Sequence, residues 1–205
     1  MATGGQETLG KFLESTDPDV GLMLRVREDD NAAFEELVGR YQNRLIGLLA
    51  HMIGSRQEAE DLAQEVFLRV YRARKGYKPQ ARFSTWLFRM ATNLASNHLR
   101  GKGRNPVSAD ASGARRAVET APGPQGTASA QMRQVELEEI VREAVAALDD
   151  DQRLAVLLSK FEEMRYSEIA AVMNRSEAAV KSLLSRARLR LRDRLEPYLQ
   201  TGRRG

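Results

Sequence analysis

The sequence predicts an all-α fold with two small helical domains joined by a flexible linker, the C-terminal one containing a helix-turn-helix. Apolar residues recur at the three-and-four spacing of helices in both halves of the chain, and no stretch shows sustained strand alternation. Between the halves, Ala, Gly, Pro, Ser and Thr supply 18 of the 26 residues from 105 to 130, a composition typical of a linker. Near the C-terminus, a short helical pattern and a long one meet at Asn174, a residue type that tolerates the left-handed backbone of a sharp corner.

Apolar spacing predicts the helices of the first half. The first covers about residues 34–52, with Asp30 as its N-terminal cap and Gly54 as its stop. The second covers about residues 55–76 and begins at Ser55, a good capping residue. A third helix, at about residues 84–100, completes this half.

The second half carries further helical patterns, at about residues 132–148, 150–163, 167–173 and 176–195. Ser167 and Ser176 are the predicted caps of the last two. The start of the chain lacks the apolar core of a signal peptide, so we expect a loose arm there. The expected organisation is an arm, a first domain, a linker, a second domain and a tail, over residues 1–16, 17–104, 105–130, 131–200 and 201–205, respectively.

The composition excludes several classes of protein. The chain has 205 residues, enough for two small domains, and it has no cysteine, which excludes disulfides and thiolate chemistry and suits a reducing cytosol. No apolar run approaches the roughly 20 residues of a membrane span. The sequence has no Walker-type loop, nucleophile elbow or HExxH motif. We therefore expect a cytoplasmic protein that is not an enzyme and uses no cofactor or metal.

Two features could belong to an enzyme in principle. His51 and His98 are the only histidines, and each occupies a near-apolar helix position, where a place in the core or on the surface is the simpler interpretation. Residues 149–151 are three consecutive aspartates, which could ligate Mg²⁺. Because they follow Leu148 and precede an apolar-periodic segment, we interpret them as a helix cap whose charge favours the helix N-terminus.

Charge is distributed unevenly, although its net value is only +4. From Arg69 to Arg104 the chain has ten Lys or Arg residues and no Asp or Glu, together with five of its twelve aromatic residues. Basic side chains attract phosphates and aromatic faces stack on unpaired bases, each stack contributing roughly 1–3 kcal/mol. This segment therefore indicates contact with opened nucleic acid. The alternative is a solvated basic surface over a core that contains the aromatics.

The second predicted helix carries an acidic stripe. Glu58, Asp61 and Glu65 share one face and are flanked by Gln57 and Gln64. Such a stripe is either simply solvated or a docking surface for a basic protein partner.

The final predicted helix has two distinct faces. At about 100° per residue, its apolar residues form one stripe, made of Val180, Leu183, Leu184, Ala187, Leu191 and Leu195. Four polar residues lie largely away from that stripe: Lys181, Ser182, Ser185 and Arg186. A helix-turn-helix places such a face in the major groove, where Lys, Arg and Ser reach base edges or phosphates.

Together these motifs resemble the sigma factors of bacterial RNA polymerase, specifically the compact extracytoplasmic-function (ECF) group. The resemblance covers about residues 20–104 and 131–200. Its carriers are residues 61–71 (DLAQEVFLRVY), 83–91 (FSTWLFRMA), Asn93, Asn97, 166–173 (YSEIAAVM) and 180–188 (VKSLLSRAR).

The resemblance implies a factor that binds core RNA polymerase and directs promoter recognition, DNA melting and transcription initiation. The clamp helices of the largest polymerase subunit would contact Asp61, Leu62, Gln64, Glu65 and Phe67. The −10 element, including a flipped base of the melted non-template strand, would contact Tyr77, Lys78, Arg82, Phe83, Trp86, Arg89, Asn93, Asn97 and Arg100. The −35 element, as duplex, would contact Arg175, Ser176, Lys181, Ser182, Ser185 and Arg186.

The resemblance also bears on partners and spacing. Family members are often held inactive by an anti-sigma factor, which is therefore a further candidate partner. The two promoter elements lie roughly 17 base pairs, or about 58 Å, apart, and a fully extended linker of roughly 85 Å would span that distance. Leu183 stands where members often carry Arg, and the loop 78–82 departs from the commoner glycine-and-acid form, so the promoter sequence is not predicted.

Two rival functions remain open at this point. A helix-turn-helix regulator that binds DNA by itself would account for residues 167–194, but it would leave the acid-free aromatic segment without a role. A metal-dependent nuclease would use Asp149–Asp151 and would lose Mg²⁺-dependent cleavage when they are replaced.

Overall fold

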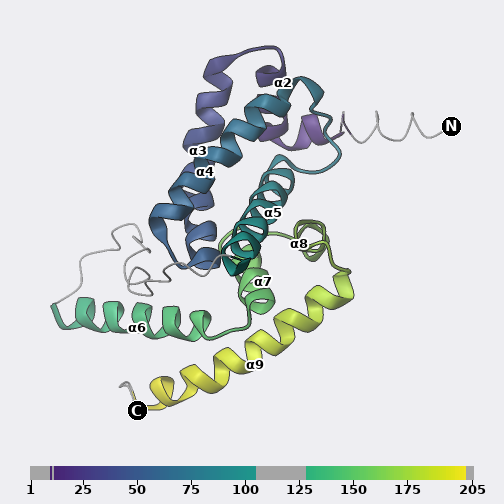
Figure 1. The fold of residues 1–205 in the computed structure, drawn as a ribbon. Helices are drawn as coiled ribbons and strands as arrows, with labels where there is room; N and C mark the ends of the chain where they lie inside the picture. Colours follow the sequence, from purple (N-terminus) through teal and green to yellow (C-terminus); the bar gives the residue numbers. More distant parts are fainter. Residues whose placement is uncertain (1–9, 11, 105–127, 202–205) are drawn as a thin grey trace. The chain divides into compact units, whose positions relative to one another are not determined.

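The computed structural model describes residues 10, 12–104 and 128–201, and these residues form helices and connecting turns without a strand (Figure 1). They belong to two compact units. The first holds α2 to α5, and the second holds α6, α7, most of α8 and α9. The predicted all-α class with two helical domains is confirmed. No helix within the described ranges is both long and apolar enough to cross a membrane.

The first unit is built mainly from α2 (Pro18–Arg27), α3 (Asn31–Ile53), α4 (Arg56–Ala73), the 3₁₀ helix η1 (Arg74–Gly76) and α5 (Phe83–Arg104). α3 packs along α4, and both contact α5, while α2 packs against α3, η1 and α5. The fully buried side chains of this core include Val20, Met23, Val26, Leu37, Leu45, Leu49, Phe83, Leu87 and Phe88.

Both ends of α3 and the start of α4 follow from their capping residues, as predicted, whereas α4 ends at Ala73 and the 3₁₀ helix η1 continues to the predicted stop at Gly76. The Asp30 carboxylate accepts a backbone hydrogen bond in the first turn of α3 at 3.1 Å, and Gly54 ends that helix with a φ of 81°. Ser55 Oγ accepts the Glu58 N–H at the start of α4, at 3.4 Å. The Glu58 carboxylate meets His98 Nε2 of α5 at 2.8 Å, so this half-buried histidine ties α5 to the first turn of α4.

The N-terminal region is more ordered than predicted. α2 begins with Asp17 as its cap and Pro18 in its first turn, an arrangement typical of helix starts. Before it, residues 12–16 are helical and Leu13 is buried. The arm predicted over residues 1–16 is therefore not loose in this part, because an apolar side chain anchors it; residues 1–9 and 11 lie outside the described residues.

The second unit contains α6 (Ala128–Ala146), α7 (Asp150–Lys160), most of α8 (Tyr166–Met173) and α9 (Glu177–Thr201). α9 packs against both α6 and α7. The buried apolar residues of the second unit include Val145, Leu148, Leu157, Leu158, Ile169, Val180, Leu184 and Ala187. α6 begins at Ala128, so the last three residues of the predicted 105–130 linker are helical, and the rest of that linker lies outside the described residues.

Candidate nucleic-acid interfaces and a protein-docking groove

Helix α5 presents an exposed polar ridge within the segment predicted to bind nucleic acid. Arg89, Asn93, Asn97 and Arg100 are all exposed, and their three-and-four spacing places them on one face of the helix. Trp86 is partly exposed at the start of the same face. Arg100 donates to Asn97 Oδ1 at 2.6 Å, which leaves the amide nitrogen of Asn97 to donate to a ligand. We call these five residues the α5 ridge.

The aromatic residues beside the α5 ridge form a cluster that reaches the surface at Trp86. The ring centroids of Tyr77 and Trp86 are 5.1 Å apart, and those of Phe83 and Trp86 are 6.0 Å apart. Phe83 also packs edge-on against Tyr41 at 5.3 Å. Phe83 is fully buried and Tyr77 is only 5% exposed. The prediction that Tyr77 and Phe83 contact DNA does not fit this conformation, in which both rings pack beneath Trp86 and leave it as the accessible one.

The hydroxyl of Tyr77 is buried and has no hydrogen-bond partner among the residues that the structure describes. Burial, and to a smaller extent the charge of Asp17, raise the pKa of Tyr77, so this side chain is a neutral phenol. An unpaired buried hydroxyl costs about 1–3 kcal/mol. The loop that carries Tyr77 is therefore held in place by other contacts.

Six of the ten basic residues of the same segment fall into two groups. One group is neutralised by an acid from elsewhere in the chain, because Arg74 and Lys75 both donate to Asp29, at 3.1 and 2.5 Å. The other group is exposed on the loop after η1 and on α5, and contains Lys78, Arg82, Arg89 and Arg100. This second group forms the surface that attracts phosphates.

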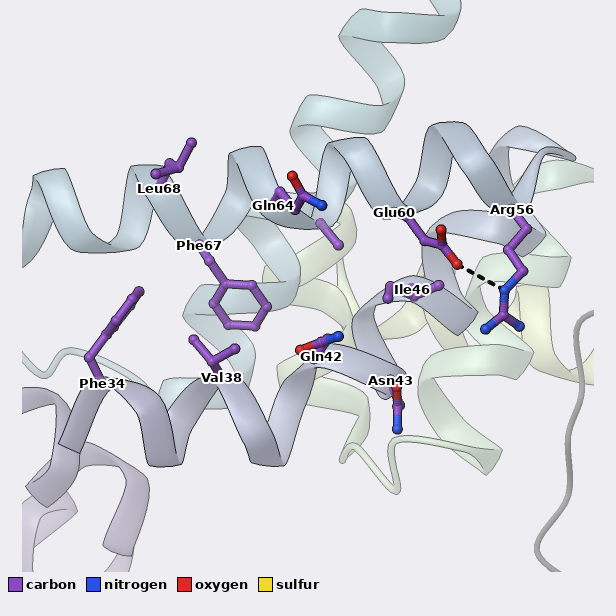
Figure 2. A pocket seen from close by; sticks show the side chains of 11 residues that line it. Phe34, Val38, Gln42, Asn43, Ile46, Arg56, Glu60, Gln64, Phe67 and Leu68 are labelled. Carbon is purple, nitrogen blue, oxygen red and sulfur yellow. Dashed lines mark hydrogen bonds and ion pairs between the residues drawn. The ribbon is translucent and has the colours of Figure 1, made fainter. Parts of the chain in front are cut away.

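Helices α3 and α4 enclose a groove of about 660 Å³, which we call the α3–α4 groove (Figure 2). Its apolar lining is Phe34, Val38, Ile46, Ala63, Phe67 and Leu68. Its polar lining is Gln42, Asn43, Gln64, Arg56 and Glu60. Arg56 and Glu60 form an ion pair at 3.0 Å at one end, while Leu68, at the other end, is 50% exposed (Figure 2). A groove between two helices, lined by both apolar and polar side chains, is suited to a helix from another protein.

Two of the five residues predicted to bind the polymerase line this groove. Gln64 and Phe67 line it, whereas Asp61, Leu62 and Glu65 lie elsewhere on α4. Asp61 is exposed. The Glu65 carboxylate accepts a hydrogen bond from Arg69 Nε at 2.7 Å, which lowers the pKa of Glu65 and keeps it ionised.

The contribution of α3 to the groove is not evident in the sequence. Phe34 and Val38 have the spacing of a fully buried helix face, but the packing of α3 on α4 leaves them half-buried. Phe34 packs against Phe67 of α4 in an edge-on contact, with ring centroids 6.5 Å apart. Only the relative position of the two helices reveals this lining.

Helix α9 carries the second candidate DNA interface. Asn174 has a φ of 53°, the left-handed corner expected there, and Ser176 Oγ accepts the Ala179 N–H at 3.2 Å as the helix cap. Four polar residues of its first turns are exposed: Lys181, Ser182, Ser185 and Arg186. The predicted two-faced helix is confirmed. Leu183 is only 8% exposed, so it belongs to the core and does not remove a DNA contact.

One predicted helix cap in this unit is wrong, and another is confirmed in its position but makes no capping bond. α8 begins at Tyr166, so Ser167 lies within it, and the Glu168 carboxylate accepts the Arg165 N–H at 2.7 Å instead. Asp149 is the residue before α7, but its side chain makes no capping bond. The reason is that its carboxylate pairs with Arg190 of α9 at 2.8 Å.

The neighbouring aspartates are also engaged by arginines. Asp151 binds Arg175 at 2.6 Å, and Asp150 lies 3.3 Å from Arg153. Arg175, a predicted DNA contact, is therefore held against the first turn of α7. Over the described ranges, no cluster of three or more His, Cys, Asp and Glu side chains is arranged to hold a metal ion.

Known proteins resemble the chain in both units. Residues 37–105 match the family Sigma-70 region 2, and residues 138–191 match the family Sigma-70, region 4. The RNA polymerase sigma-H factor of Pseudomonas aeruginosa is 35% identical over 189 residues, which cover 89% of this chain and 96% of that protein. The ECF RNA polymerase sigma-E factor of Haemophilus influenzae is 35% identical over 184 residues, which cover 88% of this chain and 97% of that protein.

A solved structure shows the same fold. The sigma factor RpoE in complex with the anti-sigma factor NepR from Bartonella quintana matches with a TM-score of 0.61 and 23% identity, over 80% of this chain and 96% of that one. The fold, the two matched regions and relatives that align along nearly their whole length lead to one conclusion. The chain belongs to the extracytoplasmic-function group of RNA polymerase sigma factors.

Proposed function

We propose that this sigma factor divides promoter recognition between its two units, with the α5 ridge holding the melted −10 element and α9 reading the duplex −35 element. The observation that carries the proposal is the α5 ridge itself. It places one accessible tryptophan in line with amide and guanidinium groups on a single helix face. A face that only held duplex phosphates would have no use for the aromatic ring.

The chemistry of the α5 ridge fits a flipped base. Flipping a base out of a duplex costs a few kcal/mol. Stacking on Trp86 would return roughly 1–3 kcal/mol, and the side-chain amides of Asn93 and Asn97 can bond to the edge of the same base. The exposed cations on either side, Lys78, Arg82, Arg89 and Arg100, would hold the backbone phosphates.

The chemistry of α9 fits a duplex. Lys181 and Arg186 can reach guanine edges or phosphates in the major groove, and Ser182 and Ser185 can bond to either. Ser176 and Arg175 lie at the N-terminal end of the helix, where backbone N–H groups favour a phosphate. The face is the regular surface of one helix, as in other helix-turn-helix proteins.

The α3–α4 groove and the neighbouring acid Asp61 form the proposed docking site for the clamp helices of the largest polymerase subunit. The groove supplies apolar contact to a partner helix, and an exposed carboxylate beside it favours basic residues on that helix. This arrangement supports the docking interpretation of the acidic stripe over the solvated one.

We assign no catalytic step and no cofactor to this chain, because RNA synthesis belongs to the polymerase that it directs. Its place of action is the cytoplasm, together with that polymerase. The complex between the solved relative and an anti-sigma factor supports an anti-sigma partner for this chain as well.

Transcription by core polymerase from a promoter-bearing genomic library, with and without the purified chain, tests the proposal. New transcripts that depend on the chain and share two upstream elements are expected. If the chain binds duplex DNA by itself and produces no new transcripts, the regulator hypothesis replaces the proposal. Cleavage that requires Mg²⁺ and is lost when Asp149–Asp151 are replaced would favour the nuclease hypothesis instead.

A further inference from the structure

The loop between η1 and α5, residues 77–82, is fastened at both ends by acids from a distant part of the chain. Asp17 and Asp29 flank α2, the first as its N-cap and the second just beyond its last turn. Asp17 reaches the start of α5, and Asp29 reaches η1. α2 therefore acts as a brace with one attachment on each side of the loop.

The carboxylate of Asp17 serves two helix starts at once. Its Oδ1 accepts the backbone N–H of Asp19 in α2, and its Oδ2 accepts the backbone N–H of Phe83 in α5, both at 3.1 Å. The residue before α5 is Arg82, whose side chain has donors only and cannot accept the first N–H groups of that helix. Those groups need an acceptor. α5 therefore takes its cap from a residue 66 positions away.

Asp29 holds the other end of the loop with two charged hydrogen bonds. Its backbone is left-handed, with a φ of 68°, a conformation that Asp tolerates better than most residues. Its Oδ1 accepts from Arg74 Nε at 3.1 Å, and its Oδ2 accepts from Lys75 Nζ at 2.5 Å. The bond from Lys75, followed by that from Arg74, lowers the pKa of Asp29, so the anchor stays charged.

α2 is itself firmly attached to the first unit. Val20, Met23 and Val26 are buried in the core, and the Asp19 carboxylate binds both Arg40 and Tyr41 of α3. Gly10, eight residues before α2, lies close to the middle of the loop, because a Cβ added there would lie 3.3 Å from Cγ of Pro79. Because α2 is fixed to the core in this way, its hydrogen bonds can hold the loop in a defined position.

We propose that Asp17 and Asp29 are positioning residues for −10 recognition, through which α2 sets the presentation of Trp86 to the melted strand. This inference rests on the proposed function of the α5 ridge. Trp86 lies in the first turn of α5, which Asp17 caps, and its ring packs on Tyr77, which directly follows η1. Both supports of the ring therefore depend on the brace.

The test compares two full-length variants that carry the same substitution at two helix caps. Asp17→Ser keeps an acceptor for α2, because Ser is a good cap, but its single hydroxyl cannot serve α5 as well. Asp30→Ser changes the cap of α3, where the Asp30 carboxylate accepts from the Ala33 N–H and from Arg25 and makes no hydrogen bond to α5 in the described part of the chain. Emission of Trp86, the only tryptophan, reports the ring's surroundings in the free protein. Holoenzyme affinity for single-stranded non-template −10 DNA, taken from a promoter found in the library, reports its function.

We expect Asp17→Ser to shift the Trp86 emission and to weaken strand binding about tenfold, the change expected from one lost hydrogen bond to a charged group. Core-polymerase binding should stay within about twofold, and Asp30→Ser should leave both readouts unchanged. Asp29→Asn should also weaken strand binding, but only about twofold, because exposed ion pairs are weak.

Equal emission and equal strand affinity for Asp17→Ser and Asp30→Ser would overturn the inference and leave Asp17 as an ordinary cap. If Asp29→Asn leaves strand affinity unchanged, Asp29 is not a positioning residue. If the unmodified holoenzyme itself fails to bind the −10 strand, the proposed function of the α5 ridge fails. The Trp86 emission then still decides whether Asp17 positions the ring.

Discussion

The two candidate DNA interfaces are built in different ways. On α9, the proposed recognition side chains lie on one exposed face of a regular helix whose opposite face is buried. The surface around Trp86 instead depends on α2, η1, the loop and α5, with one contact joining residues 66 positions apart. The difference teaches that the proposed duplex-reading face forms within one helix, whereas the proposed surface for an opened strand depends on contacts between distant parts of the chain.

The largest expected effect is a loss of folding stability in the first unit when the buried ring that supports Trp86 is removed. Phe83→Ala removes a fully buried ring that packs on Tyr41 and Trp86, and it should lower the free energy of unfolding of this unit by about 3–5 kcal/mol. Urea unfolding followed by Trp86 fluorescence measures the loss. Phe12→Ala, at a position of the same unit that is 61% exposed, is the control. Equal losses for the two variants would show that Phe83 is not a core residue.

Replacement of the accessible ring should affect function more than folding. Trp86→Ala removes the proposed stacking platform, which is expected to reduce open-complex formation by about 5- to 150-fold. Binding to core polymerase should be unchanged. Leu99→Ala, on a different face of α5, is the control in the same assay. Loss of polymerase binding by Trp86→Ala would refute the assigned role.

The helix ends and the two faces of α9 could be predicted from the sequence because they depend on local signals. Asp30, Gly54 and Ser55 act on backbone groups within a turn of themselves, and helical spacing alone separates Lys181 from Leu184. α2 also had such a signal, Asp17 followed by Pro18, which its short and weakly patterned apolar stripe obscured.

The remaining features could not be predicted because they depend on which surfaces meet. Nothing near Phe83 in the sequence shows that its N–H is capped from Asp17 or that its ring lies under Trp86. The lining of the α3–α4 groove depends on how far α4 covers α3, which residue spacing does not define.

A third variant tests the duplex side of the comparison. Replacing Lys181 and Arg186 together by Ala should weaken binding to −35 duplex and should reduce the slope of log affinity against log salt by about 2 if both contact phosphates. Binding measured over a range of salt concentrations gives that slope. Lys160→Ala, at an exposed position on α7, should leave it unchanged. An unaltered slope in the double variant would move the contact away from this face of α9.

The smallest expected effect concerns the buried hydroxyl of Tyr77. Tyr77→Phe removes an oxygen that has no partner in the described part of the chain, so the free energy of unfolding should stay the same or rise. The ring contact with Trp86 remains, and −10 strand binding should therefore be unchanged. Urea unfolding is the measurement. A clear decrease in stability would show that the Tyr77 hydroxyl makes a hydrogen bond. It would then contradict the account in which contacts other than that hydroxyl hold the loop.

Permanganate reactivity of promoter thymines, measured with the holoenzyme on a promoter found in the library, tests the division of labour most directly. Permanganate oxidises unpaired thymines, so the account predicts reactive thymines at the −10 element and none at the −35 element. A bound holoenzyme that leaves the −10 thymines unreactive, or that also exposes thymines at the −35 element, would contradict it.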